Sequence, residues 1–140
     1  MSRILAIDYG KKRTGIAVSD PSQIIASGLT TVNTCDLLDF LKDYLLREPV
    51  ERIVIGLPRT MDYEYSESMS YIKPFVKKLK ALFVDLPVVF FDERFTSVLA
   101  HQAMLDSGIG KKKRQNKALV DQISATIILQ GYMESQRKTI

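Results

Sequence analysis

The chain opens with two apolar segments, residues 3–9 and 12–19, that are separated by only a short turn. Parallel strands need a long crossover, so a link this short predicts an antiparallel hairpin. Gly10 and Gly15 are expected to supply the backbone freedom of this hairpin. Residues 24–32, which follow the turn at Asp20 and Pro21 and are rich in Ile, Thr and Val, predict a third strand. The fold therefore begins as an antiparallel meander.

Helices and apolar strands alternate in the rest of the chain. Thr34 is a candidate N-cap for a leucine-spaced helix that ends near Glu48, and residues 53–57 form a fully apolar run typical of a central strand. A helix over 66–83 contains Pro74, which should kink it or delay its start. A strand over 88–91 and helices over 96–105 and 118–134 follow. The pattern predicts an α/β fold, a mixed sheet with helices on both faces.

Composition narrows the class of protein. A chain of 140 residues that is 46% hydrophobic fits one domain over 1–140. No apolar run is long enough for a membrane span and the start lacks a signal-peptide core, so we expect a cytoplasmic protein with no membrane partner. One cysteine and one histidine exclude an internal disulfide and a Cys- or His-based metal site, so any metal would have oxygen ligands. The net charge of +4 favours a polyanionic partner.

Three acids occupy positions where the pattern expects other residues. Asp8 continues the face of Ile4 and Ala6, Glu93 follows the last strand, and Asp121 lies on the apolar stripe of the last helix. At one sheet edge they would form an oxygen-rich site for Mg²⁺ or Mn²⁺, suited to phosphodiester cleavage. Each acid also has a simpler interpretation: a turn residue, a solvated strand end, or an acid that the helix dipole favours near an N-terminus.

Basic residues surround the predicted acids. The candidates for phosphate contact are Lys12, Arg13, Arg94, Lys111, Lys112, Lys113, Arg114 and Lys117. The alternatives are that 111–117 is a solvated loop and that Arg94 pairs with Asp92. Tyr63, Tyr65 and Tyr71 are candidates for stacking on bases, with ordinary packing as the alternative. Neither His101 nor Cys35 is assigned a chemical role.

Four ordered motifs resemble the YqgF family, also called RuvX, of Holliday junction resolvases. They are Asp8-Tyr9-Gly10 with Lys12 to Ala17 and Asp20, I-V-I-G-L-P ending at Pro58, Asp92-Glu93-Arg94 with Thr96-Ser97, and Val120-Asp121 with I-L-Q-G-Y ending at Tyr132. The resemblance implies an RNase H-like fold, with a five-stranded mixed sheet in the order 3-2-1-4-5 and strand 2 antiparallel. It also implies a two-metal nuclease site with Asp8, Glu93 and Asp121 as the catalytic, metal-binding acids.

Several functions remain open on the sequence alone. The resemblance implies a metal-dependent endonuclease for structured RNA or DNA, linked to junction resolution and to processing of the precursor small-subunit ribosomal RNA 5′ end, with pre-ribosomal particles as partners. Thr60 and Tyr63 replace the Asn and Gly of the family loop, which leaves the substrate contacts of that loop open. The alternatives are a non-catalytic nucleic-acid-binding or ribosome-assembly module and, least favoured, an actin-like phosphotransferase fragment. Monomer and homodimer are both compatible with the sequence.

Overall fold

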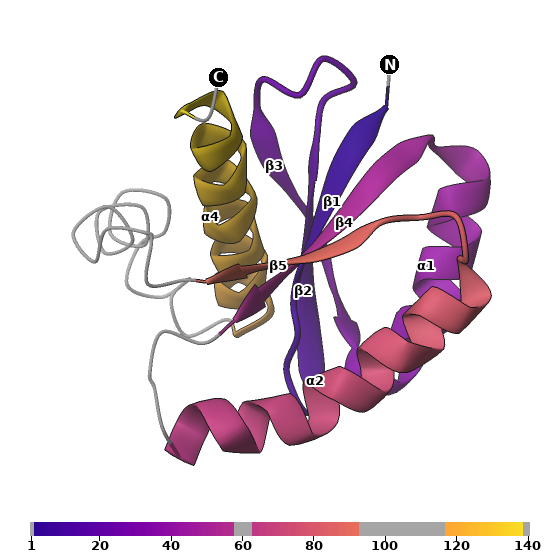
Figure 1. Cartoon of the computed structure of the whole chain (residues 1–140), viewed down its shortest axis with the longest axis vertical. Helices are drawn as coiled ribbons and strands as arrows, with labels where there is room; N and C mark the ends of the chain where they lie inside the picture. Colours follow the sequence, from indigo (N-terminus) through magenta and orange to yellow (C-terminus); the bar gives the residue numbers. More distant parts are fainter. Residues whose placement is uncertain (1, 58–62, 93–116, 139–140) are drawn as a thin grey trace.

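The computed structural model describes residues 2–57, 63–92 and 117–138, and these build a five-stranded sheet in the order β3-β2-β1-β4-β5 (Figure 1). The strands are β1 Arg3–Asp8, β2 Arg13–Ser19, β3 Ala26–Asn33, β4 Val50–Leu57 and β5 Val88–Asp92. β2 pairs antiparallel with β1 and β3, whereas β1, β4 and β5 run parallel. The predicted strand order and the antiparallel second strand are confirmed.

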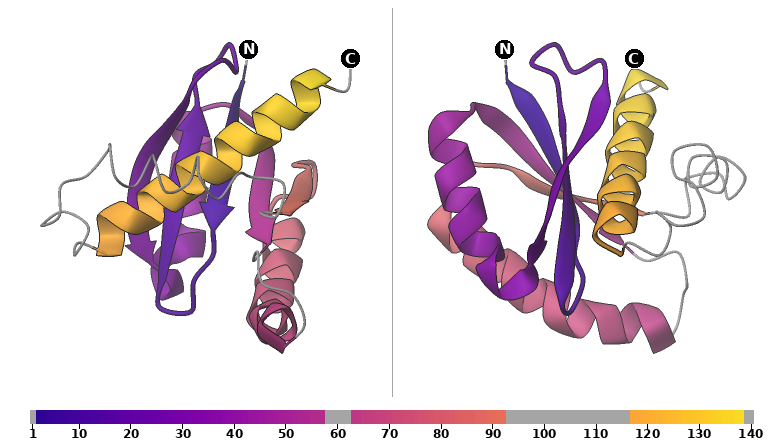
Figure 2. Two further views of the ribbon diagram at one scale, coloured as in Figure 1. Left: turned by 90° about the vertical axis from the view of Figure 1, so that its left-hand side faces the viewer. Right: turned by 180° about the vertical axis from the view of Figure 1, so that it is seen from behind.

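Helices cover both faces of this sheet, as predicted (Figures 1 and 2). A short 3-10 helix, η1 Thr34–Asp36, leads into α1 Leu37–Arg47, which packs on one face together with α2 Tyr63–Leu82. The last helix, α4 Lys117–Lys138, crosses the opposite face over β2, β3 and β1. Because α2 runs through Pro74 from a start well before it, the proline does not delay the helix.

The alternation of β1 separates two apolar layers. Leu5 and Ile7 point into the layer beneath α1 and α2, while Ile4 and Ala6 point into the layer beneath α4. Residues on both sides of the strand are buried, which explains its nearly continuous apolar sequence. Full burial of each large aliphatic side chain contributes about 1.5–3 kcal/mol, so the position of β1 at the centre of the sheet is strongly determined.

One local expectation is wrong. Thr34 does not cap α1, because η1 intervenes and the helix starts at Leu37 after Asp36. Among the described residues the only positive φ angle is that of Gln23, at 58°, so neither Gly10 nor Gly15 adopts the left-handed conformation. The helix predicted over 96–105 and most of the basic loop lie outside the described residues. In the part of the chain that the structure describes, no helix is long and apolar enough to cross a membrane.

Candidate functional site

Asp8 ends β1 on the face that α4 covers. Ile4 and Ala6 precede it on that face and are buried against α4, so the strand delivers a carboxylate to the rim of an apolar layer. Burial, and to a smaller extent the negative charge of Asp121, raises the pKa of Asp8 from 3.8 to about 6. Within the described ranges, no ion pair offsets the charge of Asp8. The fold therefore holds a poorly solvated carboxylate at the end of its central strand.

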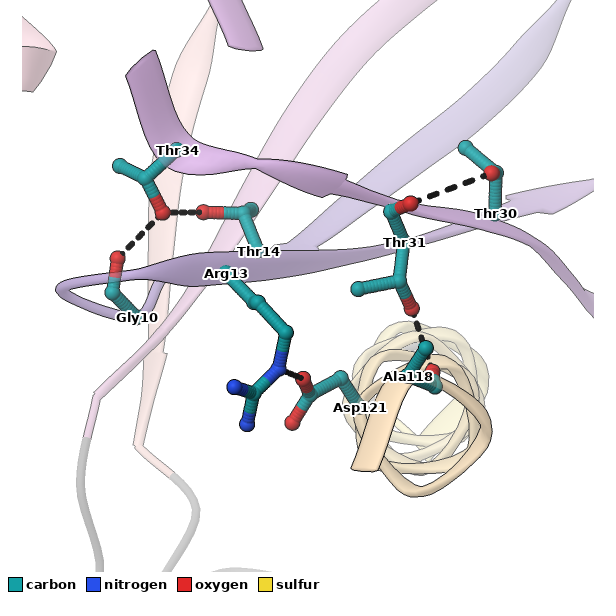
Figure 3. Close-up of polar contacts among 8 residues, drawn as sticks. All are labelled: Gly10, Arg13, Thr14, Thr30, Thr31, Thr34, Ala118 and Asp121. Atoms are coloured by element: carbon teal, nitrogen blue, oxygen red, sulfur yellow. Dashed lines mark hydrogen bonds and ion pairs between the residues drawn. The ribbon is translucent and has the colours of Figure 1, made fainter. Parts of the chain in front are cut away.

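Asp121 reaches the same place from α4. Ala125, Ile128 and Tyr132 continue its side of the helix and are buried against the sheet, as the stripe in the sequence predicts. The guanidinium of Arg13 donates from Nε to Oδ2 of Asp121 at 3.0 Å (Figure 3). Arg13 begins β2, so this ion pair joins the first hairpin to the last helix.

Gly15 explains how Asp121 comes so close to Asp8. In the ladder between β1 and β2, Gly15 is the partner of Asp8. A Cβ built on Gly15 would overlap the backbone carbonyl of Asp121. Any other residue would therefore push α4 away from the strand. The sequence suggests that this glycine provides backbone freedom, but what the site requires is the absence of a side chain.

Three threonines that sequence reasoning missed hold the parts of the site together (Figure 3). Thr34 donates from Oγ1 to the carbonyl of Gly10 at 2.6 Å, and its Oγ1 lies 2.9 Å from Oγ1 of the fully buried Thr14. Thr31 on β3 donates to the carbonyl of Ala118 in the first turn of α4. In the sequence these threonines are recognisable only as polar residues in or next to apolar strands, and that pattern does not predict which groups they bond to.

The remaining predicted residues divide into two groups. Lys12 and Lys117 are exposed beside Arg13 and at the start of α4. The others lie outside the described residues: Glu93, Arg94, Lys111, Lys112, Lys113 and Arg114. Arg13 is a predicted phosphate ligand, but in this structure it binds a carboxylate.

Two carboxylates with one poorly solvated member suit a hard divalent cation, because such cations prefer carboxylate and water oxygens. Among the described residues no group of three potential ligands is present. Asp8 and Asp121 are the two carboxylates that the described segments bring to this edge of the sheet. Both acids lie at the carboxyl edge of β1, where ligands gather in open α/β sheets.

A solved structure shares the fold of this chain. The chain superposes on T. thermophilus RuvC in complex with a Holliday junction substrate with a TM-score of 0.62, at 14% identity, covering 99% of this chain and 98% of that one. This likeness shows the RNase H-like fold that RuvC shares.

Sequence comparison places the chain more narrowly. It is 66% identical over 137 residues to a protein of Bacteroides thetaiotaomicron and 59% identical over 137 residues to one of Flavobacterium johnsoniae; each match covers 98% of this chain and 99% of the relative. Both relatives carry the name "Putative pre-16S rRNA nuclease". The family model RuvX, described as Holliday junction resolvase, matches residues 2–135. The chain therefore belongs to the RuvX family.

Proposed function

We propose that this protein is a metal-dependent endonuclease that hydrolyses phosphodiesters of structured nucleic acid, with precursor small-subunit ribosomal RNA as the first substrate to test and the Holliday junction as the second. The observation that carries the proposal is the approach of Asp121 to the half-buried end of β1, where Asp8 has a raised pKa. Arg13 pairs with Asp121, but within the described ranges no cation offsets the charge of Asp8. A further cation between the two acids would do so, and carboxylate side chains are ligands for Mg²⁺ or Mn²⁺. The names of the relatives support nuclease activity.

Asp8 and Asp121 would hold the metal, with Glu93 as the third acid that the family motif suggests. When bound there, Mg²⁺ or Mn²⁺ supplies positive charge that activates a water and stabilises the leaving oxygen of the phosphodiester. Arg13 orients Asp121 through its 3.0 Å contact. The exposed Lys12 and Lys117 are placed to attract the phosphate backbone, so binding should weaken as salt rises.

The test is a cleavage assay on a precursor ribosomal RNA fragment and on a four-way DNA junction, each with Mg²⁺ or Mn²⁺. Asp8→Asn and Asp121→Asn should each abolish cleavage while the far-UV circular dichroism spectrum stays native. Asp43→Asn is the matched control, because Asp43 is an exposed carboxylate on α1 that pairs with Arg47, and it should retain wild-type activity. Full activity in a contaminant-free Asp8→Asn preparation would overturn the proposal, and so would wild-type protein that cleaves neither substrate with either metal.

A further inference from the structure

A cavity opens at the same edge of the sheet as Asp8, on the opposite face from Asp121. It has a volume of about 370 Å³, which is within the range of about 300–1,000 Å³ that small-molecule sites occupy. We call it the aromatic pocket; the lining residues that matter here are Tyr9, Tyr71, Phe75, Lys11, Lys78 and Cys35. Tyr9 directly follows Asp8 in the chain, so their Cα atoms lie about 3.8 Å apart. Because side chains alternate along a strand, those of Asp8 and Tyr9 point to opposite faces of the sheet at this edge.

The wall of the pocket is aromatic. The ring centroids of Tyr9 and Tyr71 are 5.9 Å apart with 28° between the ring planes, and those of Tyr9 and Phe75 are 4.7 Å apart. Phe75 is buried in the core, whereas Tyr9 and Tyr71 are only half-buried. Two partly exposed aromatic rings therefore border the cavity. Such rings accept any base, because every nucleobase has a π-face.

The rim of the pocket is positive. Lys11 in the turn between β1 and β2 and Lys78 on α2 are both exposed. Neither lysine forms an ion pair within the described residues. A neighbouring pocket of about 610 Å³ has the opposite character, because three aspartates, Asp36, Asp39 and Asp43, line it beside Arg13. A polyanion is therefore favoured at the aromatic pocket and opposed at its neighbour.

The pocket is also held in shape by hydrogen bonds. The backbone N–H of Thr34 donates to the carbonyl of Lys12 at 2.9 Å, and its hydroxyl donates to the carbonyl of Gly10 at 2.6 Å. The bond between Thr34 and Gly10 is drawn in Figure 3. Together the two bonds fasten both sides of Lys11 to the start of η1, next to Cys35. A preorganised site loses less conformational entropy when a ligand binds.

We propose that the aromatic pocket binds one unpaired nucleobase of the substrate strand, adjacent to the phosphate that Asp8 and Asp121 serve. This inference rests on the proposed function. It adds a binding site for a base on the face of the sheet opposite the proposed metal site. A strand that crosses the end of β1 places a phosphate on the Asp8 side and a base on the Tyr9 side. The base stacks against Tyr71, and Lys11 and Lys78 contact the flanking phosphates.

Cys35 provides a direct readout of occupancy. It is the one cysteine in the sequence, it is exposed, and it lines the pocket. The experiment measures the rate at which iodoacetamide alkylates Cys35 in the full-length wild-type protein, in EDTA so that no strand is cleaved. The probes are a short single-stranded RNA, the DNA of the same sequence, and an abasic sugar-phosphate strand of equal length. The base-containing strands should slow alkylation at concentrations at which the abasic strand, although bound, does not.

Variants separate stacking from general charge. Lys78→Gln should weaken binding of the base-containing strands more than Lys77→Gln, since the two exposed lysines are consecutive on α2 but only Lys78 lines the pocket. Tyr71→Leu should weaken binding about five-fold or more relative to Tyr71→Phe, because stacking contributes at least roughly 1 kcal/mol per base. Fluorescence anisotropy measures these affinities, and a thermal melt checks that each variant is folded.

The outcomes distinguish this inference from the proposed function. Equal protection of Cys35 by base-containing and abasic strands, or equal affinities of Lys78→Gln and Lys77→Gln, would overturn the base site. Metal-dependent cleavage without protection of Cys35 would also overturn it, and would leave the nuclease standing. Base-dependent protection in a protein that never cleaves would support the pocket and overturn the nuclease. The absence of any binding would overturn both.

Discussion

Asp8→Asn should stabilise the metal-free protein at neutral pH, although it removes a proposed catalytic group. The folded state raises the pKa of Asp8 from 3.8 to about 6, chiefly through burial and secondarily through Asp121. At about 1.4 kcal/mol per pH unit, ionised Asp8 costs the folded protein about 3 kcal/mol. Asparagine has a similar shape and no charge, so the variant avoids this cost. For a domain of this size the gain corresponds to a melting temperature roughly 10 °C higher.

The pH dependence of the effect identifies its cause. Between pH 3.8 and about 6 the folded state retains the Asp8 proton that the unfolded chain has lost, so the stability of the wild type falls as pH rises through this window. The stability difference between Asp8→Asn and wild type should therefore be largest above pH 6 and should vanish below about pH 4.

The assay is urea unfolding monitored by circular dichroism from pH 4 to 8 in EDTA, followed by the same series in Mg²⁺. Mg²⁺ should stabilise the wild type, because a ligand that binds only the folded state raises its stability, and it should do so much less for Asp8→Asn. The reasoning would be refuted if the variant were no more stable than the wild type at pH 7.5 in EDTA. It would also be refuted if the gap between them were the same at pH 4.

Three further predictions follow from contacts around the site. Gly15→Ala should remove metal-dependent cleavage and destabilise the fold by about 1–3 kcal/mol, because its Cβ overlaps the carbonyl of Asp121. Gly28→Ala is the control, since its Cβ would meet only side-chain atoms at 3.3 Å or more. It should have a much smaller effect in the same cleavage and urea-unfolding assays. Arg13→Gln should slow cleavage while changing the unfolding free energy by no more than about 1 kcal/mol, since the ion pair is partly exposed; a cleavage rate equal to wild type would contradict a positioning role. Asp20→Asn should destabilise the protein at pH 7 and not in strong acid, because hydrogen bonds from the backbone of Ile24 and Ile25 lower the pKa of Asp20; urea titrations at both pH values check this.

Much of the fold is predictable from local pattern. The short link between β1 and β2 requires an antiparallel pair, and the apolar runs of β4 and β5 require strands that join the sheet between helices. The alternation of β1 also predicts correctly that Asp8 shares the face of Ile4 and Ala6. These features depend on side-chain period and chain length, which neighbouring residues specify.

The site is only partly predictable in this way. The helical stripe of α4 indicates that Asp121 lies toward the sheet, and the structure agrees. The sequence does not indicate that Arg13 pairs with Asp121, or that Thr34 bonds to Gly10 rather than capping α1. These contacts join residues that are far apart in the chain, so no local propensity specifies them.

The sequence by itself determined the antiparallel first hairpin and the faces on which Asp8 and Asp121 lie, because period and spacing are properties of neighbouring residues. Its motifs indicated the family, and the strand order followed from that resemblance. Only the tertiary structure decided why Gly15 must be a glycine and what surrounds Tyr9. Gly15 must be a glycine because the carbonyl of Asp121 occupies the space that a Cβ would need. Tyr9 packs against the rings of Tyr71 and Phe75 on α2. Both depend on where helices dock against the sheet, and docking is decided by packing between segments that are distant in sequence.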